Sequence, residues 1–133
     1  MPGGLPQFHM IAGGARPVAP YSHAVEAAGF VFLTGQIAND PANDAAAMPA
    51  DIEGQTRRVM ENLKIVLAGL KLGLEHVVAA RVFLTDFKPH YARMNRVYES
   101  HFARGRLPAR TCIGVTALAR DALVEIDVIA RRP

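Results

Sequence analysis

One short segment of the chain places an arginine at the start of a predicted strand. Residues 107–115 read Leu-Pro-Ala-Arg-Thr-Cys-Ile-Gly-Val. Pro108 fixes its own φ angle and biases Leu107 toward extended backbone, so no helix continues into Arg110. An arginine side chain presents five N–H donors in one plane and stays charged, which suits a planar carboxylate. The segment therefore indicates a carboxylate-binding arginine, and the competing interpretation is an ordinary solvent-exposed ion pair.

An acidic pair lies on a second predicted strand, over residues 122–130. Glu125 and Asp127 are two residues apart, so their side chains share one face of that strand. Glu125 is flanked by apolar residues, and such an isolated carboxylate can orient or activate a water molecule. If this strand pairs directly with the strand of Arg110, the two side chains would flank one small pocket. The alternative for both acids is a structural ion pair with a nearby arginine.

Four further positions are candidates for a binding pocket, and each has a structural alternative. Tyr21 follows a proline-restricted segment, where a phenol can bind a substrate or simply face water. Gly35 ends a strand and would let a ligand approach the backbone, or would only form a bulge. Asn95 could point into a pocket from a helix or be solvated. Cys112, two residues after Arg110, could have a lowered thiol pKa or act as a small hydrophobic residue.

The composition is that of a globular protein. Half of the 133 residues are hydrophobic and 20% are charged, enough for one domain over residues 1–133 with a substantial core. No apolar run approaches the ~20 residues of a membrane span, and residues 1–8 lack the features of a signal peptide. The single cysteine excludes an intrachain disulfide, which fits a reducing compartment. We therefore expect a cytoplasmic protein without a membrane partner.

Charge and histidine placement argue against two kinds of site. The net charge is only +3 and the basic residues are scattered, whereas nucleic-acid-binding surfaces show a basic stripe with interleaved aromatic residues. The five histidines have no metal-ligand spacing, and a structural zinc site usually needs several thiolates. We expect neither a metal site nor a nucleic-acid partner.

Hydrophobic periodicity predicts two helices and six strands. A seven-residue repeat predicts a helix over residues 51–72 that ends at Gly73, and aromatic residues at helical spacing predict a second helix over residues 89–102. Strands are expected over residues 8–11, 24–27, 30–34, 77–85, 110–115 and 122–130. The order β-β-β-α-β-α-β-β predicts an α+β fold in which both helices cover one face of a mixed sheet.

The second face of this sheet also carries apolar residues. On the last predicted strand, Val124, Ile126 and Val128 lie on one side, whereas Leu123 and Ile129 lie on the other. Two helices can cover only one side of the sheet, so the other side needs a different partner. We therefore expect a homo-oligomer in which other subunits bury this face.

Five blocks of the sequence fall in the order and at the spacing of one known family. They are Pro20-Tyr21, Leu33 to Ile37, Asn95 to Glu99, Pro108 to Cys112 and Val124 to Ala130. Together they resemble the RidA/YjgF (reactive intermediate deaminase) family over nearly the whole chain. The Pro-Ala-Arg-Thr-Cys block is the most specific of the five.

The resemblance implies a chorismate-mutase-like fold, assembled as a trimer with clefts between subunits. It also implies hydrolysis of 2-imino acids, such as 2-iminobutanoate and 2-iminopropanoate, to 2-keto acids and ammonia, with no metal or organic cofactor. Arg110 matches the arginine that binds the substrate carboxylate, and Glu125 matches the glutamate that positions the attacking water. The residues that match pocket positions are Tyr21, Gly35, Asn95 and Cys112, the glycine and cysteine acting mainly through backbone groups.

Two other functions remain open at this point. A non-catalytic protein that binds small carboxylates, such as 2-keto acids, would keep Arg110 without hydrolysing an imine. Ribonuclease activity is attributed to some relatives, but the scattered basic residues and the lack of a His/Lys/Glu constellation argue against it. Ala19 stands where family members often carry glycine, so the preferred imine is not given by the resemblance.

Overall fold

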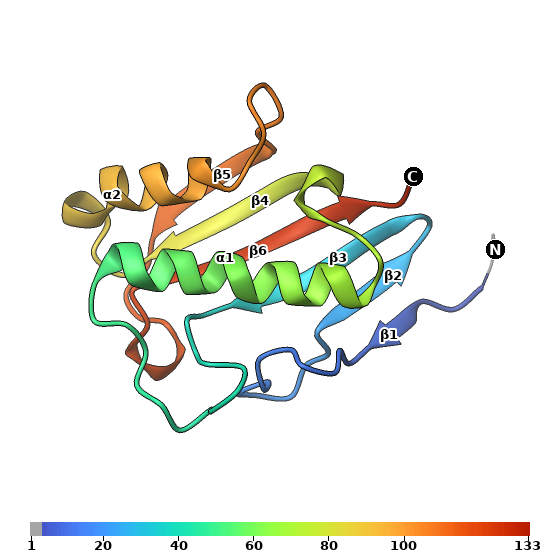
Figure 1. Ribbon diagram of the computed structural model, residues 1–133, viewed down its shortest axis with the longest axis horizontal. Coiled ribbons are helices and arrows are strands. Elements are labelled where there is room, and N and C mark those ends of the chain that lie inside the picture. The colour runs from blue at the N-terminus through green and yellow to red at the C-terminus, as the bar shows by residue number, and fades with distance from the viewer. Residues whose placement is uncertain (1–3) are drawn as a thin grey trace.

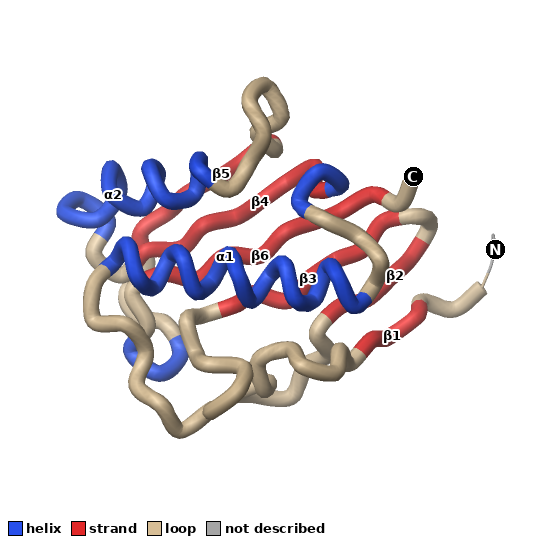
Figure 2. The backbone as a smooth tube through the Cα atoms, in the orientation of Figure 1, coloured by secondary structure: helices blue, strands red, loops and turns tan. Residues whose placement is uncertain are grey.

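The computed structural model describes residues 4–133, which form a six-stranded sheet with two helices on one face (Figure 1). The strands are β1 (Gln7–His9), β2 (Ala24–Ala27), β3 (Phe30–Gln36), β4 (Val77–Leu84), β5 (Ala109–Gly114) and β6 (Val124–Arg131). The helices are α1 (Ile52–Gly69) and α2 (Phe87–Ser100). Figure 2 shows both helices on the same side of the sheet. The predicted α+β class and element order are confirmed.

The sheet is mixed, and its strand order separates β5 from β6. The order across the sheet is β1-β2-β3-β6-β4-β5. Only β4 and β5 run parallel, and α2 forms the crossover that a parallel pair requires. Because β4 lies between β5 and β6, the strands that carry Arg110 and Glu125 do not pair, and the condition for a pocket flanked by both side chains within one chain is not met.

The hydrophobic core fills the space between the sheet and the helices, and we call this side of the sheet the helix face. Alternate residues of β6, namely Val124, Ile126 and Val128, are buried there beneath α1. The opposite side, which we call the open face, leaves large apolar side chains in solvent. Phe32 and Ile113 on this side are 45% and 46% exposed. The expected second apolar face is therefore present, and nothing within residues 4–133 covers these two side chains.

Helix α1 ends before the predicted Gly73, at a residue in the left-handed conformation. The backbone N–H of Leu72 donates to the Leu67 carbonyl at 2.9 Å, and that of Lys71 donates to Ala68 at 3.0 Å. These two bonds form a Schellman motif, which needs a residue with positive φ just past the helix. Lys71 occupies that position with a φ of 62°, although glycine is the usual residue there.

Lys71→Gly is expected to raise the free energy of unfolding by about 1 kcal/mol, because glycine adopts positive φ without the steric cost of a β-carbon. Lys71 is exposed, so its loss removes little packing. Urea unfolding followed by circular dichroism measures the change. Lys64→Gly, inside the same helix, is the control and should lower stability by about 1 kcal/mol. A Lys71→Gly protein less stable than wild type would contradict the assignment.

Helix α2 begins two residues before the predicted start. Asp86 is its N-cap and Phe87 its first residue, so Pro89 is the third residue of the helix. A backbone N–H in the first turn has no partner within the helix, and proline therefore costs no hydrogen bond there. Neither this helix nor any other among residues 4–133 is long and apolar enough to cross a membrane.

Candidate functional site

Arg110 lies on the helix face at the edge of the sheet, next to α2. It pairs in register with Ala80 of β4 and, through that residue, with Val128 of β6, and both partners are buried on the helix face. Its Nη1 donates a hydrogen bond to Oδ1 of Asn95 at 2.8 Å. Its Nη2 donates to the hydroxyl of Tyr91 at 3.4 Å. Helix α2 thus supplies two neutral oxygens that orient the guanidinium.

The same guanidinium lies over two aromatic rings of α2. Its central carbon lies 5.0 Å from the ring centroid of Tyr98 and 5.9 Å from that of Tyr91, within the range of cation–π attraction. Within residues 4–133, no carboxylate lies at ion-pair distance from Arg110. The solvent ion pair considered for this arginine is therefore absent from the described chain. Two of its five N–H donors serve Asn95 and Tyr91, which leaves three for another acceptor.

A pocket of about 320 Å³ opens beside Arg110. It is lined by Asn95, Tyr98, Glu99, Leu107, Pro108 and Arg110. Asn95 is among the residues that line this pocket, and its role in binding stays a prediction. The pocket combines the Arg110 cation, aromatic and apolar walls and one acidic residue, Glu99. A small organic anion can bind in such a pocket at the Arg110 guanidinium.

Cys112 follows Arg110 on the helix face but is not an activated nucleophile. The residue is partly buried and packs against the hydrophobic core. Burial raises the pKa of its thiol, and the opposing effect of the Arg110 charge is smaller. The lowered thiol pKa considered from the sequence is therefore wrong, and the side chain behaves as a small hydrophobic group.

Glu125 lies on the open face, at the other side of the sheet from Arg110. It pairs in register with Phe83 and alternates along β6 with the buried Val124 and Ile126. Burial raises the pKa of its carboxyl group above the ordinary value of 4.5, and the Asp127 charge adds to this, whereas the Arg81 charge acts in the opposite direction. A carboxylate with a raised pKa is a stronger proton acceptor, so Glu125 is suited to the role of a general base.

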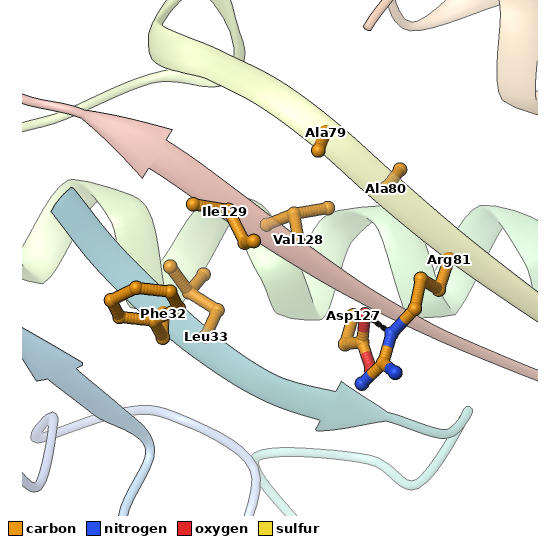
Figure 3. Close-up of a pocket in the computed structure, with 8 residues that line it drawn as sticks. All are labelled: Phe32, Leu33, Ala79, Ala80, Arg81, Asp127, Val128 and Ile129. Atoms are coloured by element: carbon orange, nitrogen blue, oxygen red, sulfur yellow. Dashed lines mark hydrogen bonds and ion pairs between the residues drawn. The ribbon is translucent and has the colours of Figure 1, made fainter. Parts of the chain in front are cut away.

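The ion pair suggested for the acidic residues of β6 forms at Asp127 and not at Glu125. Nε of Arg81 donates to Oδ1 of Asp127 at 3.0 Å, and its Nη2 donates to Oδ2 at 2.7 Å. Figure 3 shows Arg81 extending from β4 to Asp127 on β6, whereas Phe32 and Ile129 line the same pocket farther along the sheet. Asp127 is thus paired with Arg81, whereas Glu125 has no ion-pair partner within residues 4–133.

The six predicted site residues fall into separate groups. Arg110, Asn95 and Cys112 gather on the helix face at β5 and α2. Glu125 and Gly35 are neighbours across β6 and β3. Tyr21 lies on the loop before β2, where its hydroxyl accepts a hydrogen bond from the Val18 N–H at 3.0 Å. The strands of Arg110 and Glu125 are two spacings apart, about 10 Å, and Arg110 is in register with Val128, three residues or about 10 Å along β6 from Glu125. The two side chains also lie on opposite faces of the sheet.

The sequence interpretation missed three residues of these groups. Tyr91 and Tyr98 were expected only as apolar residues of an amphipathic helix, yet they contact the Arg110 guanidinium. Their spacing held the signal, because positions 91, 95 and 98 lie on one side of a helix. Arg81 had no signal, because its partner Asp127 is 46 residues away in the sequence. Within residues 4–133, no group of three or more His, Cys, Asp or Glu residues is arranged to hold a metal ion.

Comparisons with known proteins identify the family. The family model described as endoribonuclease L-PSP matches residues 13–132. The RutC family protein slr0709 of Synechocystis sp. is 41% identical over 117 residues, which cover 88% of this chain and 89% of the relative. RidA from an Antarctic Psychrobacter species matches with a TM-score of 0.86 and 29% identity, over 94% of this chain and 98% of that one. E. coli TdcF, solved with bound serine, gives a TM-score of 0.83 and 30% identity over 94% and 99%. With its sequence blocks, its fold and these matches in agreement, the chain belongs to the RidA/YjgF family, whose members are also named RutC and endoribonuclease L-PSP proteins.

Proposed function

We propose that the protein hydrolyses small 2-imino acids, such as 2-iminobutanoate and 2-iminopropanoate, to 2-keto acids and ammonia. The observation that carries this proposal is the environment of Arg110, a cation with free donors and no carboxylate partner within residues 4–133. A guanidinium in this state can bind a substrate carboxylate through two parallel hydrogen bonds. TdcF, a relative with the same fold, was solved with serine, which carries such a carboxylate.

The proposed reaction needs orientation more than strong activation. The carbon of a C=N bond is already electrophilic, so a bound carboxylate and a correctly placed water lower the barrier substantially. Arg110 binds the substrate carboxylate and thereby fixes the plane of the imine. Glu125 takes a proton from the attacking water as the C–O bond forms, and the proton passes to the imine nitrogen. The resulting carbinolamine gives up its hydroxyl proton to Glu125, which returns a proton to the amine nitrogen, so the C–N bond breaks as the C=O bond forms and the products are NH3 and the 2-keto acid.

The proposal includes a homotrimer with sites between subunits. Arg110 and Glu125 lie on opposite faces of one sheet, so they cannot both contact the same three- or four-carbon acid within one chain. A neighbouring copy can bring its Glu125 to the Arg110 pocket. The exposed apolar side chains of the open face, including Phe32 and Ile113, support the burial of that face by other copies. Tyr21, which lies apart from both groups, is proposed to complete the pocket in the same assembly.

The direct test uses an imine that is generated enzymatically in the assay mixture. Threonine dehydratase releases 2-iminobutanoate from threonine, and semicarbazide traps the imine in competition with its hydrolysis. We expect catalytic amounts of the protein to divert the imine from the trap and speed the formation of free 2-ketobutanoate above the spontaneous rate. Saturable binding of 2-ketobutanoate, measured by calorimetry, with no acceleration would instead identify a non-catalytic carboxylate-binding protein.

The pH dependence of the reaction should report the raised pKa of Glu125. The carboxyl must be ionised to accept a proton, so kcat/KM should fall as the pH decreases through a pKa above 4.5. Asp127→Asn removes a negative charge that raises this pKa and leaves Arg81, which lowers it. The acid limb should therefore move to lower pH in the Asp127→Asn protein. An acid limb at the same pH in both proteins would argue against Glu125 as the titrating group.

A further inference from the structure

Gly35 lies in an irregular part of β3, directly against the side chain of Glu125. Leu33 pairs with Val128 and Gln36 pairs with Ile126, so β3 contains one more residue than β6 between these pairs. This extra residue is a β-bulge, a feature that re-aims neighbouring side chains. The alternative interpretation of Gly35 as part of a bulge is therefore confirmed.

No side chain fits at position 35 while Glu125 keeps its conformation. A β-carbon placed on Gly35 would lie 2.9 Å from Cδ and 3.0 Å from Cγ of Glu125, and closer still to its Oε2. Two carbon atoms pack without strain at about 3.5–4.0 Å. The Glu125 carboxylate therefore lies in the space that a side chain on β3 would occupy.

Backbone conformation does not explain this glycine. Gly13, Gly29 and Gly105 have positive φ angles, which favour glycine over other residues. Gly35 does not have such an angle, and alanine could adopt its backbone conformation. The requirement at position 35 is space, and the group that fills the space is the Glu125 carboxylate.

We propose that Gly35 is a positioning residue that holds the Glu125 carboxylate against β3. The catalytic consequence rests on the proposed imine hydrolysis, but the contact itself does not. Asp127, two residues along β6 on the same face, is held by its two hydrogen bonds from Arg81. A β-carbon at position 35 would push the carboxylate off β3 and away from the place where it orients water.

A double-mutant cycle in thermal unfolding tests the contact without any substrate. Gly35→Ala is expected to lower the Tm in the wild-type background, and most of this loss should disappear in a Glu125→Ala background, where no carboxylate is displaced. Gly114→Ala is the matched control, because its β-carbon would lie 3.2 Å from Cβ of Phe87 and far from Glu125. Its Tm loss should be the same in both backgrounds. A Gly35→Ala protein with the same change in Tm in both backgrounds would overturn the proposal.

Kinetics provide the second readout. Gly35→Ala should lower kcat for 2-iminobutanoate by about tenfold and change KM less than about twofold, because a displaced base slows proton transfer while Arg110 still binds the carboxylate. Gly35→Ala should also move the acid limb of kcat/KM to lower pH, because the displaced carboxylate is better solvated. A raised KM with an unchanged kcat would assign Gly35 to substrate binding and overturn the positioning role. If the wild-type protein hydrolyses no imine, the proposed function fails, and the unfolding cycle still decides the contact.

Discussion

Replacing Arg110 with alanine is expected to lower kcat/KM for 2-iminobutanoate by about 10³-fold, because the variant loses both the carboxylate contact and the orientation of the imine. The fold should persist. Arg110 has no ion-pair partner within residues 4–133, and its removal costs one hydrogen bond to Asn95, a weaker one to Tyr91 and two cation–π contacts. Initial rates in the threonine dehydratase assay measure the loss, and circular dichroism verifies that the variant is folded.

Two further variants show whether the loss is specific. Arg110→Lys keeps the positive charge but loses the planar pair of donors, so its kcat/KM should lie between those of alanine and wild type. Arg96→Ala removes an exposed arginine from the next position to Asn95 on α2 and should leave kcat/KM within about twofold of wild type. A folded Arg110→Ala protein with wild-type kcat/KM would refute the assigned role of Arg110.

Mixing two inactive variants is expected to restore activity. Arg110→Ala keeps Glu125, and Glu125→Gln keeps Arg110, so a site shared between chains regains both groups where the two variants meet. In a trimer assembled at random from equal amounts, about a quarter of the shared sites would contain both intact residues. Co-refolding the two proteins and measuring 2-ketobutanoate formation should therefore give about a quarter of the wild-type rate.

The control for this experiment is a mixture of Glu125→Gln with Glu125→Ala. It contains no intact carboxylate at that position and should recover no activity. Subunit exchange is verified by affinity capture of differently tagged chains. If the tagged chains exchange and the mixture of Arg110→Ala with Glu125→Gln stays inactive, Arg110 and Glu125 do not share a site across subunits.

Local patterns were sufficient to predict the elements of the fold. The alternation of Val124, Ile126 and Val128 marks the buried side of β6, because one face of a strand against helices requires apolar residues at every second position. The heptad spacing in residues 52–66 predicts α1, because a helix that packs against a sheet requires apolar residues at a period near 3.6 residues. Helix ends were less predictable. Lys71 takes the left-handed position that a glycine two residues later was expected to mark.

The arrangement of the site residues could not be predicted from local sequence patterns. Which face of the sheet Arg110 occupies depends on its pairing with Ala80, a contact 30 residues away in the sequence. Nothing in local periodicity specifies that β4 lies between β5 and β6, so the distance between Arg110 and Glu125 was not accessible. The resemblance to a family is confirmed, whereas the roles of Arg110 and Glu125 stay predictions. The spatial relation between the two residues is a property of the sheet order.

In the proposed trimer, the exposed phenylalanines of the open face would connect the stability of this protein to its own concentration. A single chain has Phe32 45% exposed, and in the proposal other copies cover it. Association in the proposed trimer removes that surface from solvent in the native state only, so the folded form gains stability by mass action as the protein accumulates. At low expression the same chain would be less stable and would lack complete sites, so its activity would rise more steeply than its abundance.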